Sequence, residues 1–171
     1  MNVRLALSTA SLAALLIASI ALAQTAARTF ELEGNRLKVP GQVVFKTGSD
    51  EIAKESAGVL EHVAAYLAEK SYISLLRVEN HSDRTTDPAA QKLTEARALA
   101  VAKWLVGKGV DCKRLLPVGF GDNKPVADNS TPEGRAANRR TDFINAELRG
   151  RAIGGMPVDG GGVVAGDPCG K

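Results

Sequence analysis

The chain has 171 residues, a formal net charge of +3, 44% hydrophobic residues and 24% charged residues. These fractions are close to the average for soluble globular proteins and exclude a wholly disordered or collagen-like chain. Aromatic residues are only 4% of the sequence, and with the small net charge they argue against a nucleic-acid partner. Only the N-terminal stretch is apolar enough for a membrane, which excludes a multispanning membrane protein.

The cysteines and histidines lack the spacing of a structural zinc site. Cys112 and Cys169 are too far apart to form a C-x2–4-C pair, and His62 and His81 are the only histidines. A tetrahedral site needs four ligands, usually supplied in closely spaced pairs. We therefore expect neither a metal nor a cofactor.

Residues 1–23 have the organisation of a secretory signal peptide. Arg4 precedes a long apolar stretch, and Ala21-Leu22-Ala23 forms a small-x-small cleavage site before Gln24. The alternative is an uncleaved membrane anchor, since the stretch is nearly long enough to span a bilayer. Export would place both cysteines in an oxidising compartment, where a disulfide persists.

After this segment, short apolar runs alternate with segments of helical periodicity. We expect the following elements in chain order: a hairpin over 29–39, a strand over 42–45, a helix over 52–70, a strand over 71–78, a polar segment over 79–86, a helix that begins at Pro88 and is ended by Gly107 and Gly109, a strand over 115–120, a polar loop over 121–138 and a strand over 141–148. Two strand–helix–strand units predict an α/β (α+β) two-layer sandwich with both helices on one face of the sheet. The glycine-rich end cannot fold by itself.

Two charged residues break the expected patterns. Arg97 lies in or beside the apolar stripe of the second helix, where an unpaired charge is costly, and helical phase alone favours a structural salt bridge for it. Asn80-His81-Ser82-Asp83 follows a strand, at the edge where open α/β sheets bind ligands. Asp83 and Arg97 would then face one pocket, with Asp83 toward an ammonium and Arg97 toward a carboxylate. The alternative for Asp83 is a turn or capping residue.

The same segment does not indicate catalysis. His81, Ser82 and Asp83 are adjacent, and neighbours on a strand point to opposite faces, so they cannot form a hydrolytic relay. Considered alone, the arginine-rich segment 134–140 is interpreted as a solvated basic rim or as a cap for helix C-termini. We therefore expect a binding protein and no enzyme.

Several separated motifs carry a family resemblance. They are Val44-Phe45-x-Thr47-Gly48-Ser49-x-x-Ile52, Val78-x-x-His81-Ser82-Asp83, Leu93-Thr94-x-x-Arg97-Ala98 and Glu133-Gly134-Arg135-x-x-Asn138-Arg139-Arg140. In this order and spacing they resemble the OmpA-like peptidoglycan-binding domain, the C-terminal module of porin-like outer-membrane proteins, peptidoglycan-associated lipoproteins and flagellar stator proteins. The resemblance implies a βαβαββ fold with a mixed sheet that binds the peptide stem of the cell wall noncovalently.

The resemblance also implies roles for individual residues. Asp83 and Arg97 would hold the zwitterionic end of diaminopimelate, and Arg139 would contribute to the same pocket. The remaining residues of the expected ligand-binding set come from the matching motifs and are Phe45, Thr47, His81 and Ser82. The sequence departs from the family pattern in several places: Asn80 stands where Gly is usual, and Ser82 replaces Thr but keeps the hydroxyl. The loop from Asp83 to Arg97 is one residue short and lacks the usual Asn ahead of the second helix.

These inferences give an expected organisation of the whole chain. It comprises a signal peptide over 1–23, an N-terminal segment over 24–41, the OmpA-like domain over 42–148 and a glycine-rich tail over 149–171. The expected partners are diaminopimelate-type peptidoglycan and envelope proteins, with no nucleic acid, in the periplasm or at the outer membrane. The alternatives are a protein-interaction adaptor in which Asp83 and Arg97 pair with each other, and a membrane-anchored, stator-like protein.

The two cysteines are expected to pair. Cys112 follows the second helix and Cys169 lies in the glycine-rich tail, so a disulfide between them would tie the tail to the domain. Free exposed thiols are a liability in an oxidising compartment. Two free thiols or an intermolecular bond are the alternatives.

Overall fold

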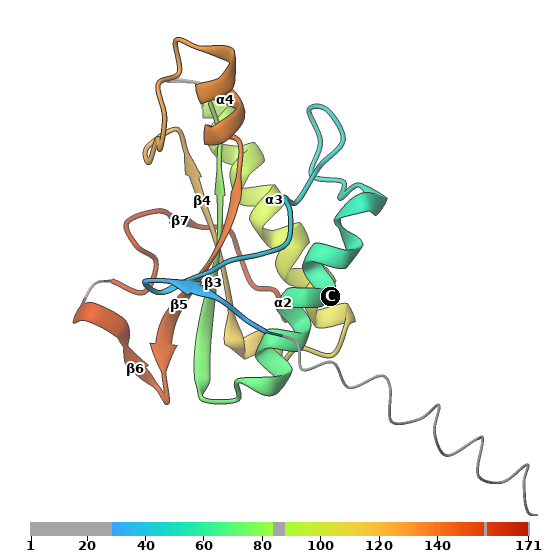
Figure 1. Cartoon of the computed structure of the whole chain (residues 1–171), viewed down its shortest axis with the longest axis vertical. Helices are drawn as coiled ribbons and strands as arrows, with labels where there is room; N and C mark the ends of the chain where they lie inside the picture. The colour runs from blue at the N-terminus through green and yellow to red at the C-terminus, as the bar shows by residue number, and fades with distance from the viewer. Residues whose placement is uncertain (1–28, 84–87, 156, 171) are drawn as a thin grey trace, which may run out of the picture. The chain divides into compact units, whose positions relative to one another are not determined.

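A mixed β-sheet with two long helices on one face forms the body of the protein (Figure 1). The computed structural model describes residues 29–83, 88–155 and 157–170. The elements are β1 (Leu32–Glu33), β2 (Arg36–Leu37), η2 (Lys54–Ser56), α2 (Ala57–Glu69), β3 (Ile73–His81), α3 (Pro88–Gly107), η3 (Cys112–Arg114), β4 (Leu115–Gly121), α4 (Pro132–Asn138), β5 (Thr141–Leu148), β6 (Arg151–Ala152), η4 (Ile153–Gly155) and β7 (Val163–Val164). The expected signal peptide lies outside the described residues.

Strand β3 lies at the centre of the sheet. It pairs in parallel with β4 and antiparallel with β5, and the strand order is β1-β2-β5-β3-β4-β7, with β6 beside β5. The predicted fold class, a two-layer sandwich with a mixed sheet, is therefore confirmed. Among the described residues, no helix has both the length and the hydropathy needed to cross a membrane.

The core lies between the sheet and the two helices. The side chains of Leu60, Val63 and Leu67 on α2 and of Ala98, Val101 and Leu105 on α3 are completely buried. Their spacing of three and four residues places them on one face of each helix, as the apolar periodicity predicts. Leu76 and Val78 of β3 are buried to the same degree.

Helix α3 is attached to β4 through side-chain hydrogen bonds and one very close backbone approach. Gln91 Nε2 donates to the carbonyl of Gly119 at 3.0 Å, and Thr94 Oγ1 accepts from the amide of Gly121 at 3.0 Å. A Cβ at Gly119 would lie 2.6 Å from the backbone nitrogen of Glu95, so only glycine fits there. This attachment fixes the part of α3 that carries Arg97.

The predicted strand over 42–45 is wrong. Only Phe45 has a strand-like contact, an isolated antiparallel bridge to Ile52. Val44 does not need a sheet, because its amide and carbonyl both bond to Ser56 Oγ and its carbonyl also accepts from the amide of Ala53. The chain therefore folds back on η2, and the first long helix begins at Ala57 instead of residue 52.

Two segments predicted as polar loops are regular structure. Glu79 and Asn80 continue β3 by pairing with both β4 and β5, and His81 continues it by pairing with β4. Their polar side chains have partners inside the protein. Residues 132–138 form α4, whose N-cap Thr131 accepts from the amide of Gly134 at 3.0 Å and is followed by Pro132. Both are N-terminal helix signals.

The second face of the sheet carries buried charges. Arg77 Nε donates to Glu79 Oε1 at 2.6 Å, and Lys124 Nζ lies 3.8 Å from the same carboxylate. Burial by itself raises the pKa of Glu79, but the hydrogen bond from His81 and the charges of Arg77 and Lys124 outweigh it. The pKa of Glu79 is therefore held below its ordinary value of 4.5.

The C-terminal residues fold against the edge of β4. Val164 of β7 pairs with Val118, and Cys169 is bonded to Cys112, which confirms the predicted disulfide. The bond joins residues 57 positions apart. Chain-entropy models assign a loop of that size about 4 kcal/mol of stabilisation.

We expect Gly119→Ala to lower the free energy of unfolding by about 1–3 kcal/mol, because the added methyl group must displace the backbone of α3. Urea unfolding followed by circular dichroism measures the change. Gly107→Ala is the matched control, since no atom lies within 4 Å of a Cβ there. Equal unfolding midpoints for Gly119→Ala and the wild type would contradict the packing described here.

We expect Glu79→Gln to make stability less sensitive to acid. A carboxyl whose pKa is lowered by folding stabilises the protein above its unfolded pKa, and this contribution is lost as pH falls through the folded value. The wild type should therefore lose stability below about pH 4.5, and the variant should lose less over the same interval. Urea midpoints measured at successive pH values test this. The exposed substitution Glu133→Gln is the control, and identical pH slopes for Glu79→Gln and the wild type would disprove the assignment.

Candidate functional site

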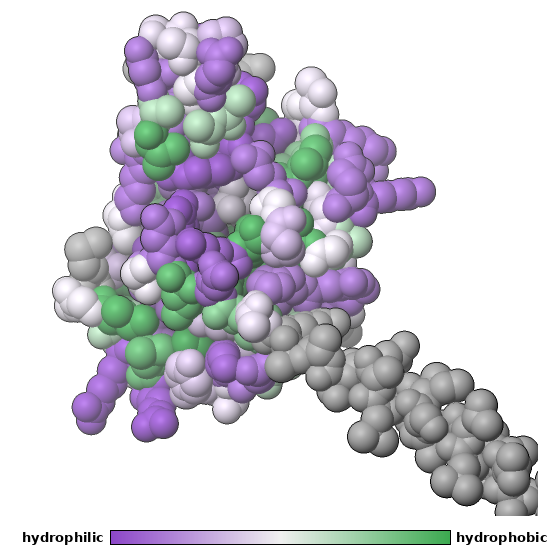
Figure 2. Space-filling model, in the orientation of Figure 1, coloured by the Kyte–Doolittle hydropathy of each residue, from purple (hydrophilic) through white to green (hydrophobic). Residues whose placement is uncertain are grey.

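The surface seen in Figure 2 is mostly hydrophilic, with hydrophobic area concentrated low on the face. Among the described residues, the exposed large hydrophobic side chains are Leu32, Val44, Tyr72, Val126, Leu148, Val163 and Val164. Apart from Val163 and Val164, which are both in β7, they come from separate segments of the chain, and single exposed apolar side chains are normal on soluble proteins. A cavity lined by several charged side chains is the stronger indication of a functional site.

This cavity has a volume of about 790 Å³ and lies beyond the carboxyl end of β3, the position at which α/β sheets bind ligands. All seven residues of the expected ligand-binding set line it: Phe45, Thr47, His81, Ser82, Asp83, Arg97 and Arg139. They come from the loop before η2, the end of β3, helix α3 and the turn after α4. The fold thus brings together residues separated by more than 90 positions in sequence.

Asp83 forms an ion pair with Arg139. Arg139 Nη1 lies 2.5 Å from Asp83 Oδ2, and the side chains are 51% and 15% exposed respectively. The adaptor alternative assumed an ion pair between Asp83 and Arg97. Among the described residues, Asp83 forms its ion pair with Arg139 instead. Partly exposed pairs of this kind contribute only about 0–1 kcal/mol, so a cationic ligand group can compete for the carboxylate.

Arg97 is oriented by the loop before η2. Its Nε donates to the carbonyl of Ser49 at 2.8 Å, and its guanidinium carbon lies 4.8 Å from the centre of the Phe45 ring. The contact with the ring is a cation–π interaction. The loop is closed by the bridge from Phe45 to Ile52 and turns at Gly48, whose φ of 68° favours glycine. This side of the cavity is therefore preformed.

Asn138 holds the segment that carries Arg139. Its buried amide oxygen accepts from the amides of Val126 and Ala127 at 2.7 and 3.1 Å, and its nitrogen donates to the carbonyl of Ala127 at 2.7 Å. Asn138 is the last residue of α4, directly before Arg139. Asn138 belongs to one of the matching motifs, but the motif alone does not predict this positioning role.

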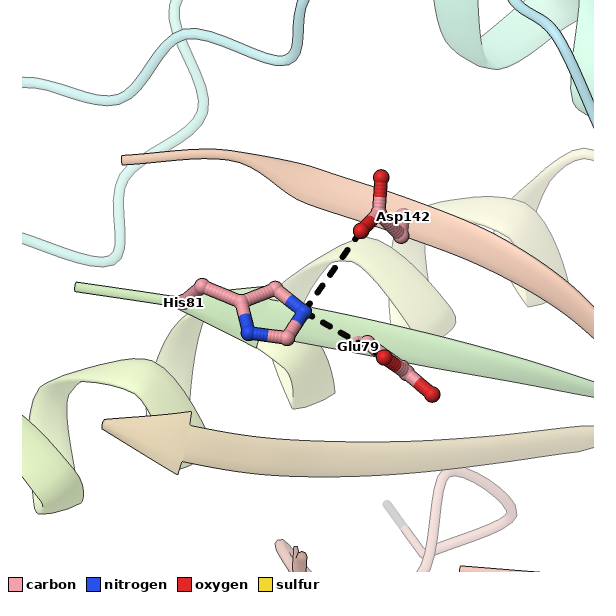
Figure 3. Close-up of side chains that lie close together, drawn as sticks. All are labelled: Glu79, His81 and Asp142. Atoms are coloured by element: carbon pink, nitrogen blue, oxygen red, sulfur yellow. Dashed lines mark ion pairs between the residues drawn. The ribbon is translucent and has the colours of Figure 1, made fainter. Parts of the chain in front are cut away.

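His81 has a different environment from the one expected. Its Nε2 points toward two carboxylates, 3.3 Å from Glu79 Oε2 and 3.6 Å from Asp142 Oδ2 (Figure 3). Its ring stacks on Phe120, with 5.0 Å between the ring centres. The imidazole is thus engaged with the charged face of the sheet, although the residue lines the cavity.

Glu79, His81 and Asp142 are close enough together to be considered as metal ligands, with one donor atom from each within 4.8 Å of the others. Both carboxylates, however, are already bonded to guanidinium groups. Glu79 accepts from Arg77 at 2.6 Å, and Asp142 accepts from Arg140 Nε at 2.8 Å. A divalent cation would have to displace these groups, and it would add positive charge to a cluster in which Lys124 and Arg36 also lie near the carboxylates. The arrangement fits an ionic network better than a metal site.

Other cavity-lining residues were not predicted from the sequence. They include Asn80, Lys92, Arg140 and Thr141. Asn80 Nδ2 donates to Thr141 Oγ1 at 2.8 Å across the β3–β5 pair. The only sequence signal for this contact was the departure from Gly at position 80.

Comparison with known proteins supports the fold. Outer membrane porin F of Pseudomonas aeruginosa is 39% identical over 68% of this chain and 33% of its own length. Outer-membrane lipoprotein YfiB of the same species is 36% identical over 67% of this chain and 70% of its own length. The chain spans about a third to a half of the first curated relatives it matches.

Solved structures have the same fold. The cell wall anchor of the T6SS from Pseudomonas aeruginosa is 28% identical, with a TM-score of 0.55 over 77% of this chain and 94% of that chain. The peptidoglycan-associated lipoprotein from Burkholderia pseudomallei is 27% identical, with a TM-score of 0.53 over 63% of this chain and 89% of that chain. The OmpA family model matches residues 44–139, more than half of the sequence, and the chain belongs to the OmpA family.

Proposed function

We propose that this protein binds peptidoglycan noncovalently, through the diaminopimelate residue of the stem peptide. The observation that carries the proposal is the presence of Asp83, Arg97 and Arg139 in the wall of one cavity. A free amino-acid end carries an ammonium and a carboxylate on the same carbon. It therefore requires an acidic and a basic group in the same cavity, as Asp83 and Arg97 are here.

The two charged groups are held in different ways, which suits exchange with a ligand. Arg97 is fixed by Ser49 and Phe45, and a guanidinium binds a carboxylate through two parallel hydrogen bonds. Asp83 is paired with Arg139, whose side chain is half exposed. A ligand ammonium would replace Arg139 at the Asp83 carboxylate or bind the carboxylate together with it. Arg139 would then be available to a second carboxylate of the stem peptide.

The relatives support the same conclusion. The names of two solved relatives describe a cell wall anchor and a peptidoglycan-associated lipoprotein, and the curated relatives are an outer membrane porin and an outer-membrane lipoprotein. We infer a location in the periplasm or at the outer membrane, following export by the signal peptide expected over 1–23. The proposal includes no catalytic step, since the His81 imidazole faces Glu79 and Asp142 instead of Ser82.

We expect Asp83→Ala and Arg97→Ala each to weaken binding of a diaminopimelate-containing muropeptide by about 2–5 kcal/mol, because each leaves one ligand charge unpaired. Isothermal titration calorimetry measures the affinity, and a pull-down with purified sacculi checks binding to the intact polymer. Arg151→Ala, on exposed β6, is the control for loss of one positive charge.

Two outcomes would count against the proposal. Wild-type affinity in both folded variants would place the ligand site elsewhere on the protein. Failure of the wild-type protein to bind sacculi would favour the protein-interaction adaptor.

We expect a stem with lysine in place of diaminopimelate to bind at least about tenfold more weakly, a difference of about 1.4 kcal/mol. Lysine at that position offers an ammonium without the adjacent carboxylate, so it leaves Arg97 without its ligand partner. Competition between the two muropeptides for the wild-type protein measures the ratio. Equal competition would show that the cavity does not recognise the zwitterionic end.

A further inference from the structure

The segment over residues 157–170, here called the C-terminal strap, covers the outer edge of β4 and part of the charged face. Beyond the β7 pairing, the amide of Ala165 donates to the carbonyl of Pro117 at 3.0 Å. Arg77 Nη1 donates to the carbonyl of Val158 at 2.6 Å. The strap approaches so closely that a Cβ at Gly162 would lie 2.4 Å from Val118 Cγ1.

Few of the strap's own side chains are buried. Pro168 is the only one of its residues that is buried, and Val163 and Val164 of β7 both expose about half of their side-chain surface. Five of its residues are glycine, at positions 160, 161, 162, 166 and 170. Glycine loses more conformational freedom on ordering than any other residue, and little buried surface offsets that loss. The covalent bond to Cys112 therefore contributes much of what keeps the strap in place.

This bond is accessible from solvent. Cys169 is exposed and Cys112 is partly exposed. Thiol–disulfide exchange requires that an attacking thiolate reach one sulfur, and exposed disulfides are the ones that exchange most readily. The buried side chains beneath the strap, among them Val118 and Phe120, are by contrast shielded while the strap is in place.

We propose that the Cys112–Cys169 disulfide is a redox-sensitive fastening and that a dithiol oxidoreductase releases the strap from β4. A thiolate of the reductant attacks Cys169 Sγ, forms a mixed disulfide and expels Cys112 as a thiolate. The second thiol of the reductant then displaces Cys169, so the reductant becomes a disulfide and the two cysteines gain two electrons and two protons. Release leaves the β4 edge unpaired and removes the Val158 carbonyl from Arg77.

The proposal is independent of ligand binding. None of the residues that line the cavity belongs to the strap. Its test therefore needs no peptidoglycan, and its failure would leave the proposed function unaffected.

Hydrogen exchange of individual amides in the full chain, with and without dithiothreitol, tests the proposal. We expect reduction to speed exchange of the Ala165 amide by about tenfold or more, because the strap leaves β4. The amide of His81, which donates to the carbonyl of Arg140 at 3.0 Å inside the sheet, should not change. The variant with Cys112→Ser and Cys169→Ser should exchange rapidly at Ala165 whether or not the reductant is present.

Two results would overturn the proposal. Unchanged exchange at Ala165 after reduction would show that noncovalent contacts hold the strap. An equal increase at Ala165 and His81 would show that the disulfide stabilises the whole domain and not the strap in particular.

Discussion

The contact of α3 with β4 at Gly119 determines where Arg97, which lines the cavity, can lie. At that point the backbone of Glu95 approaches the strand so closely that no side chain fits between them. Arg97 follows two residues later on the same helix. Its position over Phe45 therefore depends on how closely the helix packs against the strand. The guanidinium is thus placed by backbone packing, and the preformed loop before η2 then fixes its orientation.

The two faces of β3 serve different purposes. One face supplies Leu76 and Val78 to the apolar core, while Arg77 and Glu79 lie on the other, where they pair with each other. Buried charges are costly unless they are paired and bonded, and here each carboxylate has a guanidinium partner. The cluster does not need a metal to be stable. It also explains why His81 is buried although its sequence neighbours are polar, because the imidazole lies against Glu79 and Asp142.

Much of the fold could be predicted, because the apolar periodicity of the long helices and the central strands is strong. Predictions of local secondary structure failed where hydrogen bonds of polar groups determined the conformation. Ser56 took the hydrogen bonds that would have made residues 42–45 a strand, and the pairing of Glu79 across the sheet extended β3. The motifs predicted seven residues that the structure places around one cavity, but they did not predict the partner of Asp83. The resemblance placed Asp83 and Arg139 in the same pocket, but no sequence pattern predicted a direct ion pair between residues 56 positions apart.

The buried amide of Asn138 has a consequence for the long connection between β4 and α4. It bonds to the backbone of that connection at Val126 and Ala127, and to no side chain there except that of Asn129. Backbone groups are the same whatever residue supplies them. The connection can therefore change in sequence, or carry a spectroscopic label at an exposed position such as Val126, while Arg139 keeps its place.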